Sequence, residues 1–567
     1  MTLENHHPAP KQHIYAFFIL CLSPLFSPYL INPNIAPYYF IPAFALLSLL
    51  IFLCHSSRVN IRVPYLAIIF FLFSIPFIYD SHLLLFSFAL ASIFLMGNLL
   101  SHRNLDDAYK VFSISTGIII LISLYVWLGL NGKEALHFYG WALTTDALGV
   151  KINGPFANGN VLAIVMLCAW VISAYYWLNS EKQTQWLWLC VLLFFWIYIF
   201  LSMARGAWLA QAFMCIWFII VLLRKKEKKK LIALIGAGIL AALIGNSLLS
   251  QFQSPPPTSI AGPEQKFNSI IESSFTSRKI IWESAWNIWL NHPISGVGAS
   301  QLKAHYLTSQ AAVMDSFPNT HGAGATDSAH NIFLHLLAEY GVLGLVLWLL
   351  ISSLLLQQTW KYKFKSNSIR WPALTSALVL WFQGHINISL TEPYPLIIFA
   401  FMLGISCRLS LRSYGMHVKH QWLLISISIV LIGLLSTGIQ STKTWYTFEK
   451  WLRMDNSHPD KGLLANKLAE DDALYPFIVS FSFPHMARTG NEKLLHQLQP
   501  MVLRALSIYQ SPTLYRELFY TYVINNKFND ACQLGKFIKK QRWRSESNSE
   551  AYDRVCQGLV PDKKYYF

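Results

Sequence analysis

Long apolar segments recur along most of this chain, and each is close to the length of a membrane-crossing helix. Such a helix needs about 20 mostly apolar residues. Only 13% of the residues are charged, which is about half the share in a soluble domain. This excludes a soluble enzyme, a disordered chain and a disulfide scaffold. We predict an all-α polytopic membrane protein with about 13 transmembrane helices. They lie near residues 14–31, 37–54, 63–79, 83–100, 111–130, 161–178, 186–202, 206–223, 231–249, 332–356, 372–388, 394–407 and 421–438.

The basic residues give these helices a direction. The formal net charge is +16, and lysine and arginine gather in alternate loops between the predicted spans, as cytoplasmic loops do. The densest run extends from Arg224 to Lys230. RNA binding is the alternative interpretation of this run, but an anchor beside lipid headgroups is simpler, and we expect no nucleic-acid partner. The pattern predicts a cytoplasmic N-terminus and an outward C-terminus.

Three larger pieces then fall on the outward side: the loops 131–160 and 250–331, and the tail 441–567. Apolar residues in 280–289 recur every three or four residues, which predicts a helix on the membrane surface or under a lid. We expect two domains, a transmembrane domain over 1–440 that includes the 250–331 loop, and the soluble tail.

The tail has helical periodicity and few strand signals, and we expect it to be an interaction surface. Residues 522–531 are typical of the turn between paired helices of a helical-repeat array, although no regular repeat length is visible. The predicted helical segments are Leu463–Leu474, Glu492–Tyr509 and Leu514–Lys540.

The eight cysteines divide into two groups. Those within predicted spans are expected to pack as apolar residues. Cys532 and Cys556 lie in the outward tail, where an oxidising setting makes a disulfide between them plausible. No cysteine or histidine spacing suggests a metal site, and we expect no metal and no cofactor. The cysteines in spans are Cys21, Cys54, Cys168, Cys190, Cys215 and Cys407.

Three outward cations are candidate ligands for an anion. Arg205 interrupts an apolar stretch at a tight outward turn, on the wrong side for a topology anchor. Arg278 and Lys279 precede the predicted surface helix and a Gly296-Val297-Gly298 run, which is weak evidence for phosphate binding on its own. Two separate cations at a membrane surface could clamp a diphosphate.

A polar segment enters the predicted span near 332–356. His330 and Asn331 stand at its start, and Glu339 follows two turns deeper. A histidine at the outward surface suits proton abstraction from a hydroxyl at neutral pH. The alternatives are a solvated or capping histidine and a structural hydrogen bond for Glu339. His321 and Asp327, in the glycine-rich stretch before it, are supporting candidates.

Asn158 and Asn160 precede the span near 161–178 at its outward mouth. Their side chains could donate hydrogen bonds to sugar hydroxyls. An ordinary helix cap is the alternative.

These elements together resemble the O-antigen ligase and polymerase superfamily of bacterial inner-membrane glycan transferases. The resemblance covers roughly residues 140–410, and the long helical tail is similar to that of pilin-type O-linked oligosaccharyltransferases of the PglL and PglS type. The residues that carry it are Gly154–Asn160, Ala204–Ala207, Arg278, Trp282, Pro293, Gly296–Gly298, Ala329–Leu334, Glu339, Gly341 and Gly344.

The resemblance implies a GT-C-like ligase fold, a periplasmic tail and a glycan donor linked to undecaprenyl diphosphate. His330 would be the catalytic base, and Arg205 and Arg278 would bind the diphosphate without a metal. One displacement implies inversion at the anomeric carbon. The acceptor would be a Ser or Thr hydroxyl of a pilin-like protein, with membrane lipid as the other partner.

Two other functions stay open from the sequence. One is a ligase to lipid A-core or an O-antigen polymerase. The other is a transporter of lipid-linked sugars, which would favour polar residues near the middle of the bilayer rather than at one face.

Overall fold

The structure is a computed structural model of the whole chain. It describes residues 12–26, 36–54, 60–64, 81–130, 137–138, 141–142, 154–156, 158–252, 263–318, 320–362, 368–407, 415–454, 475–476, 478–480, 492–543 and 549–559. The chain divides into two compact units. The transmembrane unit comprises residues 1–257 and 349–442, and the loop–tail unit comprises residues 258–348 and 443–567.

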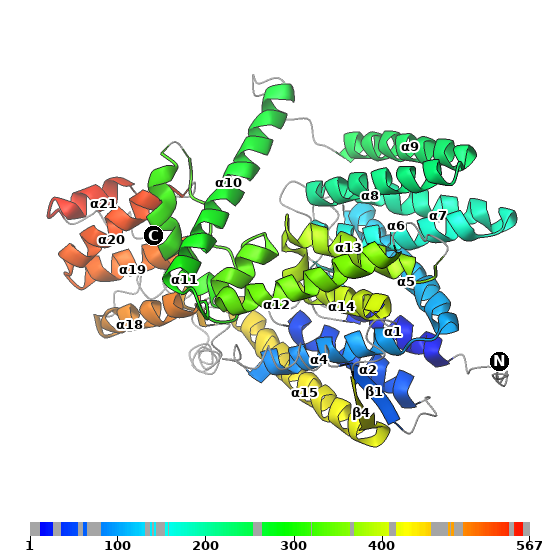
Figure 1. Cartoon of the computed structure of the whole chain (residues 1–567). Helices are drawn as coiled ribbons and strands as arrows, with labels where there is room; N and C mark the ends of the chain where they lie inside the picture. Colours follow the sequence, from blue (N-terminus) through cyan, green and yellow to red (C-terminus); the bar gives the residue numbers. More distant parts are fainter. Residues whose placement is uncertain are drawn as a thin grey trace. The chain divides into compact units, whose positions relative to one another are not determined.

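The described residues are almost entirely helical (Figure 1). This follows from the solvent, because a lipid-exposed backbone must satisfy its own hydrogen bonds. Seven of the described helices are long and apolar enough to cross a membrane, and shorter apolar helices accompany them. A helix lies at each predicted span except 63–79. Of that span the structure describes only the last two residues of β1 (Asn60–Pro64), so the number of spans stays a prediction.

The helices of the transmembrane unit follow the predicted spans closely. Helix α15 extends past residue 442, where this unit ends. They are α1 (Gln12–Phe26), α2 (Ala36–Cys54), α4 (Ser81–Leu99), α5 (His102–Leu130), α6 (Gly159–Asn179), α7 (Lys182–Leu201), α8 (Arg205–Arg224), α9 (Lys228–Phe252), α13 (Trp371–Gly384), α14 (Pro393–Cys407) and α15 (His420–Arg453). Short 3₁₀ turns lie at η2 (Gly154–Phe156) and η4 (Ile388–Thr391).

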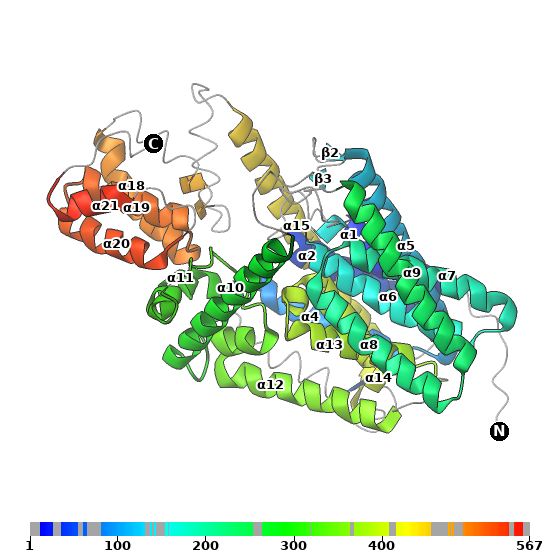
Figure 2. The same cartoon turned by 90° about the horizontal axis from the view of Figure 1, so that it is seen from above.

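Helix α6 is the core of the transmembrane unit. Every residue from Val161 to Leu178 is buried, as expected for a helix that is apolar all round. The fully buried Trp170 makes edge-on ring contacts with Trp196 of α7 and Phe218 of α8. Helices α7 and α8 pack against α6, and α9 packs on α7 and α8 (Figures 1 and 2).

A small sheet was not predicted. Strand β1 (Asn60–Pro64) pairs antiparallel with β4 (Gly415–Lys419), from Asn60 opposite Lys419 to Pro64 opposite Gly415. The pair joins two basic loops that the charge pattern assigns to the same side. A second short hairpin consists of β2 (His137–Phe138) and β3 (Trp141–Ala142).

The loop–tail unit is built from the long loop and the tail together. Its loop helices are α10 (Pro263–Asn291), α11 (Leu302–Val313), η3 (Met314–Ser316) and the first part of α12 (Ile332–Tyr362). Its tail helices are α18 (Glu492–Ile508), α19 (Pro512–Ile524), α20 (Phe528–Gln541) and α21 (Ser549–Cys556). The predicted helix at Leu463–Leu474 lies outside the described residues, whereas the helices after it and the turn at 525–527 are confirmed.

The tail packs directly on α11 of the loop. Tyr306 and Leu307 share one apolar core with Phe519 and Ile538 of the tail. Two tail glutamines fasten this contact. Gln541 is fully buried and donates to the Leu307 carbonyl at 2.6 Å, and Gln510 donates to Thr308 Oγ1 at 2.8 Å. The loop and the tail therefore form one folded body.

The disulfide between Cys532 and Cys556, which the sequence left open, is present. It joins α20 to α21 across a sequence separation of 24 residues. Closing a loop of this length stabilises the fold by about 3 kcal/mol, chiefly through the unfolded chain.

Glu517 makes the stability of the loop–tail unit depend on pH. Burial raises the pKa of this carboxyl to about 8, against the smaller opposing effect of Arg516. The folded state therefore keeps a proton that the unfolded state loses above its ordinary pKa of 4.5. Stability is greatest below that pH and falls as the pH rises towards 8.

We predict that Glu517→Gln removes most of this dependence. The test is amide hydrogen exchange in α19 and α20 of the full chain. The variant and the wild type should exchange at the same rate at pH 5, and the variant should exchange more slowly at pH 8.5. The same ratio of the two rates at both pH values would contradict the prediction.

Candidate functional site

The start of α12 holds His330 in a constrained conformation. Asn331 caps the helix, because its Oδ1 accepts hydrogen bonds from the N–H groups of Phe333 at 2.9 Å and Leu334 at 3.3 Å. His330 has a φ of 51°, in the left-handed region that few non-glycine residues adopt. Its N–H donates to Ser328 Oγ at 3.2 Å. A residue whose backbone is fixed in such a conformation is typical of a functional position.

The residues just before His330 form a local turn. Thr326 Oγ1 donates to the Ser328 carbonyl at 2.9 Å and accepts from the Ser328 N–H at 3.2 Å. Ser328 and Ala329 are buried, which anchors the segment immediately in front of the histidine. Asp327 is exposed. His321 lies further back against the tail, with its Nδ1 3.0 Å from the Arg542 carbonyl oxygen.

The glycine run after α10 packs against a break in α12. Helix α12 leaves helical geometry at Gly341, which has a φ of 61°. Because the intrahelical hydrogen bonds are interrupted there, the Ala338 and Glu339 carbonyls accept from the N–H groups of Val297 and Gly298, both at 2.9 Å. A Cβ on Gly341 would collide with the Ile294 carbonyl.

Gly296 has a matching role on the other side of this contact. Its φ is 66°, and a Cβ there would collide with the backbone of Glu339. The Gly-x-Gly run is therefore explained by close backbone packing. It supplies no separate evidence for phosphate binding.

Glu339 is buried and has structural partners. Its Oε1 accepts from the Leu302 N–H at 3.3 Å, at the first residue of α11, and its Oε2 lies 3.5 Å from His335 Nε2. Glu339 thus makes the structural hydrogen bond considered for it and ties α11 to α12. Its role in the reaction stays a prediction. His335 was not predicted, although its spacing of four residues from Glu339 on an apolar helix was a usable signal.

The predicted cations occupy different elements. Arg278 and Lys279 are neighbours on α10 in the loop–tail unit. Lys279 Nζ lies 3.9 Å from Glu283 Oε1 and 5.4 Å from the centre of the Phe317 ring. Arg205 is exposed and is the first residue of α8 in the transmembrane unit, directly after the predicted tight turn.

The two asparagines lie at the start of α6 in the transmembrane unit. Asn158 Oδ1 accepts from the Asn160 N–H at 2.9 Å, so the cap interpretation is confirmed for Asn158. The structure thus brings His330, Asn331 and Glu339 onto one helix start in the loop–tail unit. That they share one donor site with Arg205 and Arg278 stays a prediction.

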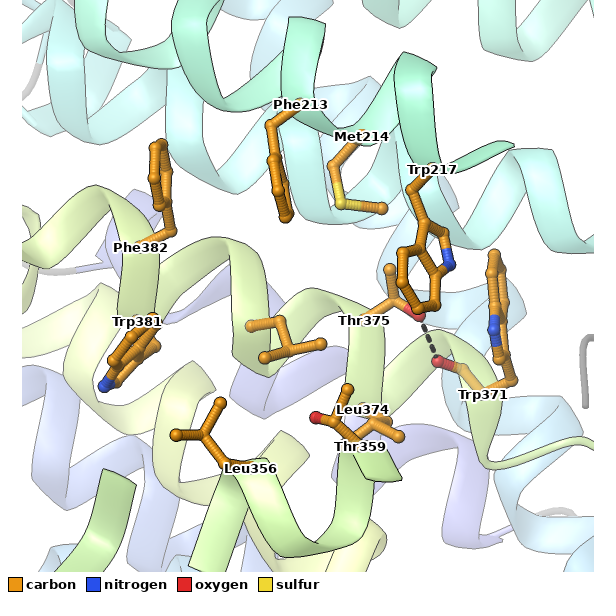
Figure 3. Close-up of a pocket in the computed structure, with 11 residues that line it drawn as sticks. Phe213, Met214, Trp217, Leu356, Thr359, Trp371, Leu374, Thr375, Trp381 and Phe382 are labelled. Carbon is orange, nitrogen blue, oxygen red and sulfur yellow. Dashed lines mark hydrogen bonds between the residues drawn. The ribbon is translucent and has the colours of Figure 1, made fainter. Parts of the chain in front are cut away.

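An apolar pocket lies in the transmembrane unit between α8, α12 and α13 (Figure 3). Its volume is about 190 Å³. The hydroxyls on its walls are already used, since Thr375 donates to the Trp371 carbonyl at 2.7 Å and Thr359 to the Leu355 carbonyl at 2.8 Å. The pocket therefore suits an apolar ligand. It is lined by Phe213, Met214, Trp217, Leu356, Thr359, Trp371, Leu374, Thr375, Leu378, Trp381 and Phe382.

One comparison with known proteins bears on this site. Residues 188–349 match a family model described as O-antigen ligase, which confirms the resemblance to that superfamily. The matched residues include Arg205, Arg278 and His330. No curated protein sequence matches the chain.

We predict that Gly341→Ala loosens the turn at 292–302. The new methyl group would meet the Ile294 carbonyl and the backbone would be strained at positive φ, at a cost of about 1–3 kcal/mol. Hydrogen exchange at Val297 and Gly298 should become at least tenfold faster in the purified chain. Gly324→Ala is the matched control, because nothing lies within 4 Å of its Cβ position. Unchanged exchange in the Gly341 variant would show that the contact does not hold the turn.

Proposed function

We propose that this chain, a multi-pass membrane protein whose residues 188–349 match the O-antigen ligase family, is a protein O-oligosaccharyltransferase. It moves a glycan en bloc from undecaprenyl diphosphate to a Ser or Thr hydroxyl of a pilin-like acceptor. The observation that carries the proposal is His330, held in a left-handed conformation beside the capped start of α12 and within the matched residues.

In the transmembrane unit, a charged turn would bind the diphosphate of the donor and an apolar pocket would bind its lipid chain. Arg205 opens α8, and Phe213, Met214 and Trp217 of the same helix line the pocket. Phe213 lies eight residues after Arg205, which is about 12 Å along the helix. A lipid with a diphosphate head and a long apolar chain matches this arrangement, with the head at Arg205 and part of the chain in the pocket.

The reaction needs a base and charge stabilisation. The acceptor hydroxyl attacks the anomeric carbon, a new C–O bond forms, and the bond from that carbon to the diphosphate oxygen breaks. His330 takes the hydroxyl proton, and the diphosphate leaves with both bonding electrons. Arg205 and Arg278 stabilise its charge, an effect typically worth a few kcal/mol for each well-placed donor. The anomeric configuration is inverted because there is one displacement.

The loop–tail unit supports a protein acceptor. The tail shares a core with α11, whose first residue is tied to Glu339 of the same helix that follows His330. A surface that recognises a protein is thus part of the folded body that carries the base. A lipid A-core acceptor fits the family match equally well, and the identity of the product decides between them.

We predict that His330→Ala lowers glycan transfer by a factor of about 10²–10⁴, the usual contribution of a general base. The test is co-expression with a glycan pathway and candidate pilins, followed by mass spectrometry of the pilins and of lipid A-core. His417→Ala is the control, since His417 is an exposed residue of strand β4.

Two outcomes would overturn parts of the proposal. Near-normal transfer by the His330 variant, at equal protein level, would remove His330 as the base. Transfer to lipid A-core that depends on His330, with no modified pilin, would keep the ligase chemistry and refute the protein acceptor.

A further inference from the structure

The first turn of α8 leaves backbone donors without partners in the helix. The N–H groups of Ala207 and Trp208 both bond to the Ala204 carbonyl, at 2.9 and 3.1 Å. The N–H groups of Arg205 and Gly206 have no carbonyl one turn earlier in the helix. Ala204, at the cap position, offers no side-chain acceptor. This turn carries the positive end of the helix dipole together with the Arg205 guanidinium.

A buried amide of α13 lies against the same turn. Gln383 is 0% exposed, and neither its Oε1 nor its Nε2 has a hydrogen-bond partner among the residues that the structure describes. A Cβ built on Gly206 would lie 2.9 Å from Nε2 and 3.0 Å from Oε1 of this amide. The carboxamide therefore faces the α8 turn, and the missing side chain of Gly206 makes the approach possible.

Such an amide is costly in this setting and calls for a ligand. An unpaired buried polar group loses its hydration without compensation, and polar groups within transmembrane helices are functional by default. The surrounding groups select an anion, because the Arg205 guanidinium, two N–H groups and the Gln383 NH₂ are all donors. A cation would meet the positive end of the helix dipole here.

The apolar pocket lies further along the same two helices. Phe382, the neighbour of Gln383, stacks on Phe213 of α8 with ring centres 5.4 Å apart, and both rings line the pocket. An anionic subsite followed by an apolar cavity fits an amphiphile, with the anion at the turn and hydrocarbon below.

We propose that the first turn of α8 and the Gln383 carboxamide form one anion subsite that binds the diphosphate of the polyprenyl-diphosphate donor. Nε2 of Gln383 donates to a diphosphate oxygen alongside the Gly206 N–H, and Arg205 contacts the outer side. This subsite rests on the proposed function, and it adds Gln383 and Gly206 to the residues that select the donor.

The test compares two leucine substitutions in the purified full chain in detergent. Gln383→Leu removes the proposed ligand. Gln211→Leu is the matched control, because Gln211 is also buried on α8 and its Nε2 also lacks a partner among the described residues. Both changes replace a buried amide whose NH₂ group lacks a partner by an apolar group of similar size, so both variants should keep the wild-type melting temperature or exceed it.

Of the two leucine substitutions, only Gln383→Leu should weaken the binding of undecaprenyl diphosphate. The expected loss is at least tenfold, because a hydrogen bond to a charged group is removed. Gly206→Ala should also weaken binding, because the added methyl group displaces the amide. Inorganic diphosphate should bind the wild type more weakly than the lipid does, since it leaves the pocket empty. Equal affinity for the two probes would refute the lipid part of the proposal.

The remaining outcomes separate this proposal from the function on which it rests. Wild-type binding by the Gln383 variant, with weak binding by Arg205→Ala, would overturn the Gln383 subsite and leave the proposed function intact. Equal weakening by both leucine variants would show a packing effect and also overturn the subsite. If the wild type bound neither undecaprenyl diphosphate nor inorganic diphosphate, both the subsite and the proposed function would be refuted.

Discussion

The contact between the Pro293–Gly298 turn and the break in α12 determines the geometry of the candidate active site. Gly341 opens the helix, so that two of its carbonyls accept hydrogen bonds from the turn instead of from the next helical turn. Gly296 allows the two backbones to touch. Glu339 adds a carboxylate that joins the start of α11. His330 stands two to three turns before this junction, and its position therefore depends on how firmly the turn is held.

Charge and apolar surface are separated along α8 in a way that suits a lipid-linked donor. The helix begins with Arg205 and uncapped N–H groups, and its middle lines a pocket whose hydroxyls are satisfied within their own helices. Gln383 lies at the boundary between the two. In this account the diphosphate is recognised by donors fixed on rigid helices, which lowers the reorganisation needed when charge develops on the leaving group.

The sequence predicts much of the fold because bilayer constraints are local. Apolar length indicates the spans, and the disulfide that the outward position of Cys532 and Cys556 made plausible is present. The capping role of Asn331 was not predicted. The pairing of β1 with β4 and the docking of the tail on α11 were missed, because both join segments more than 170 residues apart. Gln383 carried no signal either, since an isolated amide near a helix end is ordinary until its burial and its neighbour Gly206 are seen.

In the proposed function, this chain transfers an intact glycan from a lipid diphosphate to a protein hydroxyl in one displacement. The most direct measurement is reconstitution of the purified chain in vesicles with an undecaprenyl-diphosphate glycan and a pilin acceptor. Mass spectrometry and NMR of the glycopeptide would then identify the linkage. We predict a Ser- or Thr-linked glycan with inverted anomeric configuration and one undecaprenyl diphosphate released for each transfer. A retained configuration, or release of the lipid diphosphate without a modified acceptor, would contradict the account.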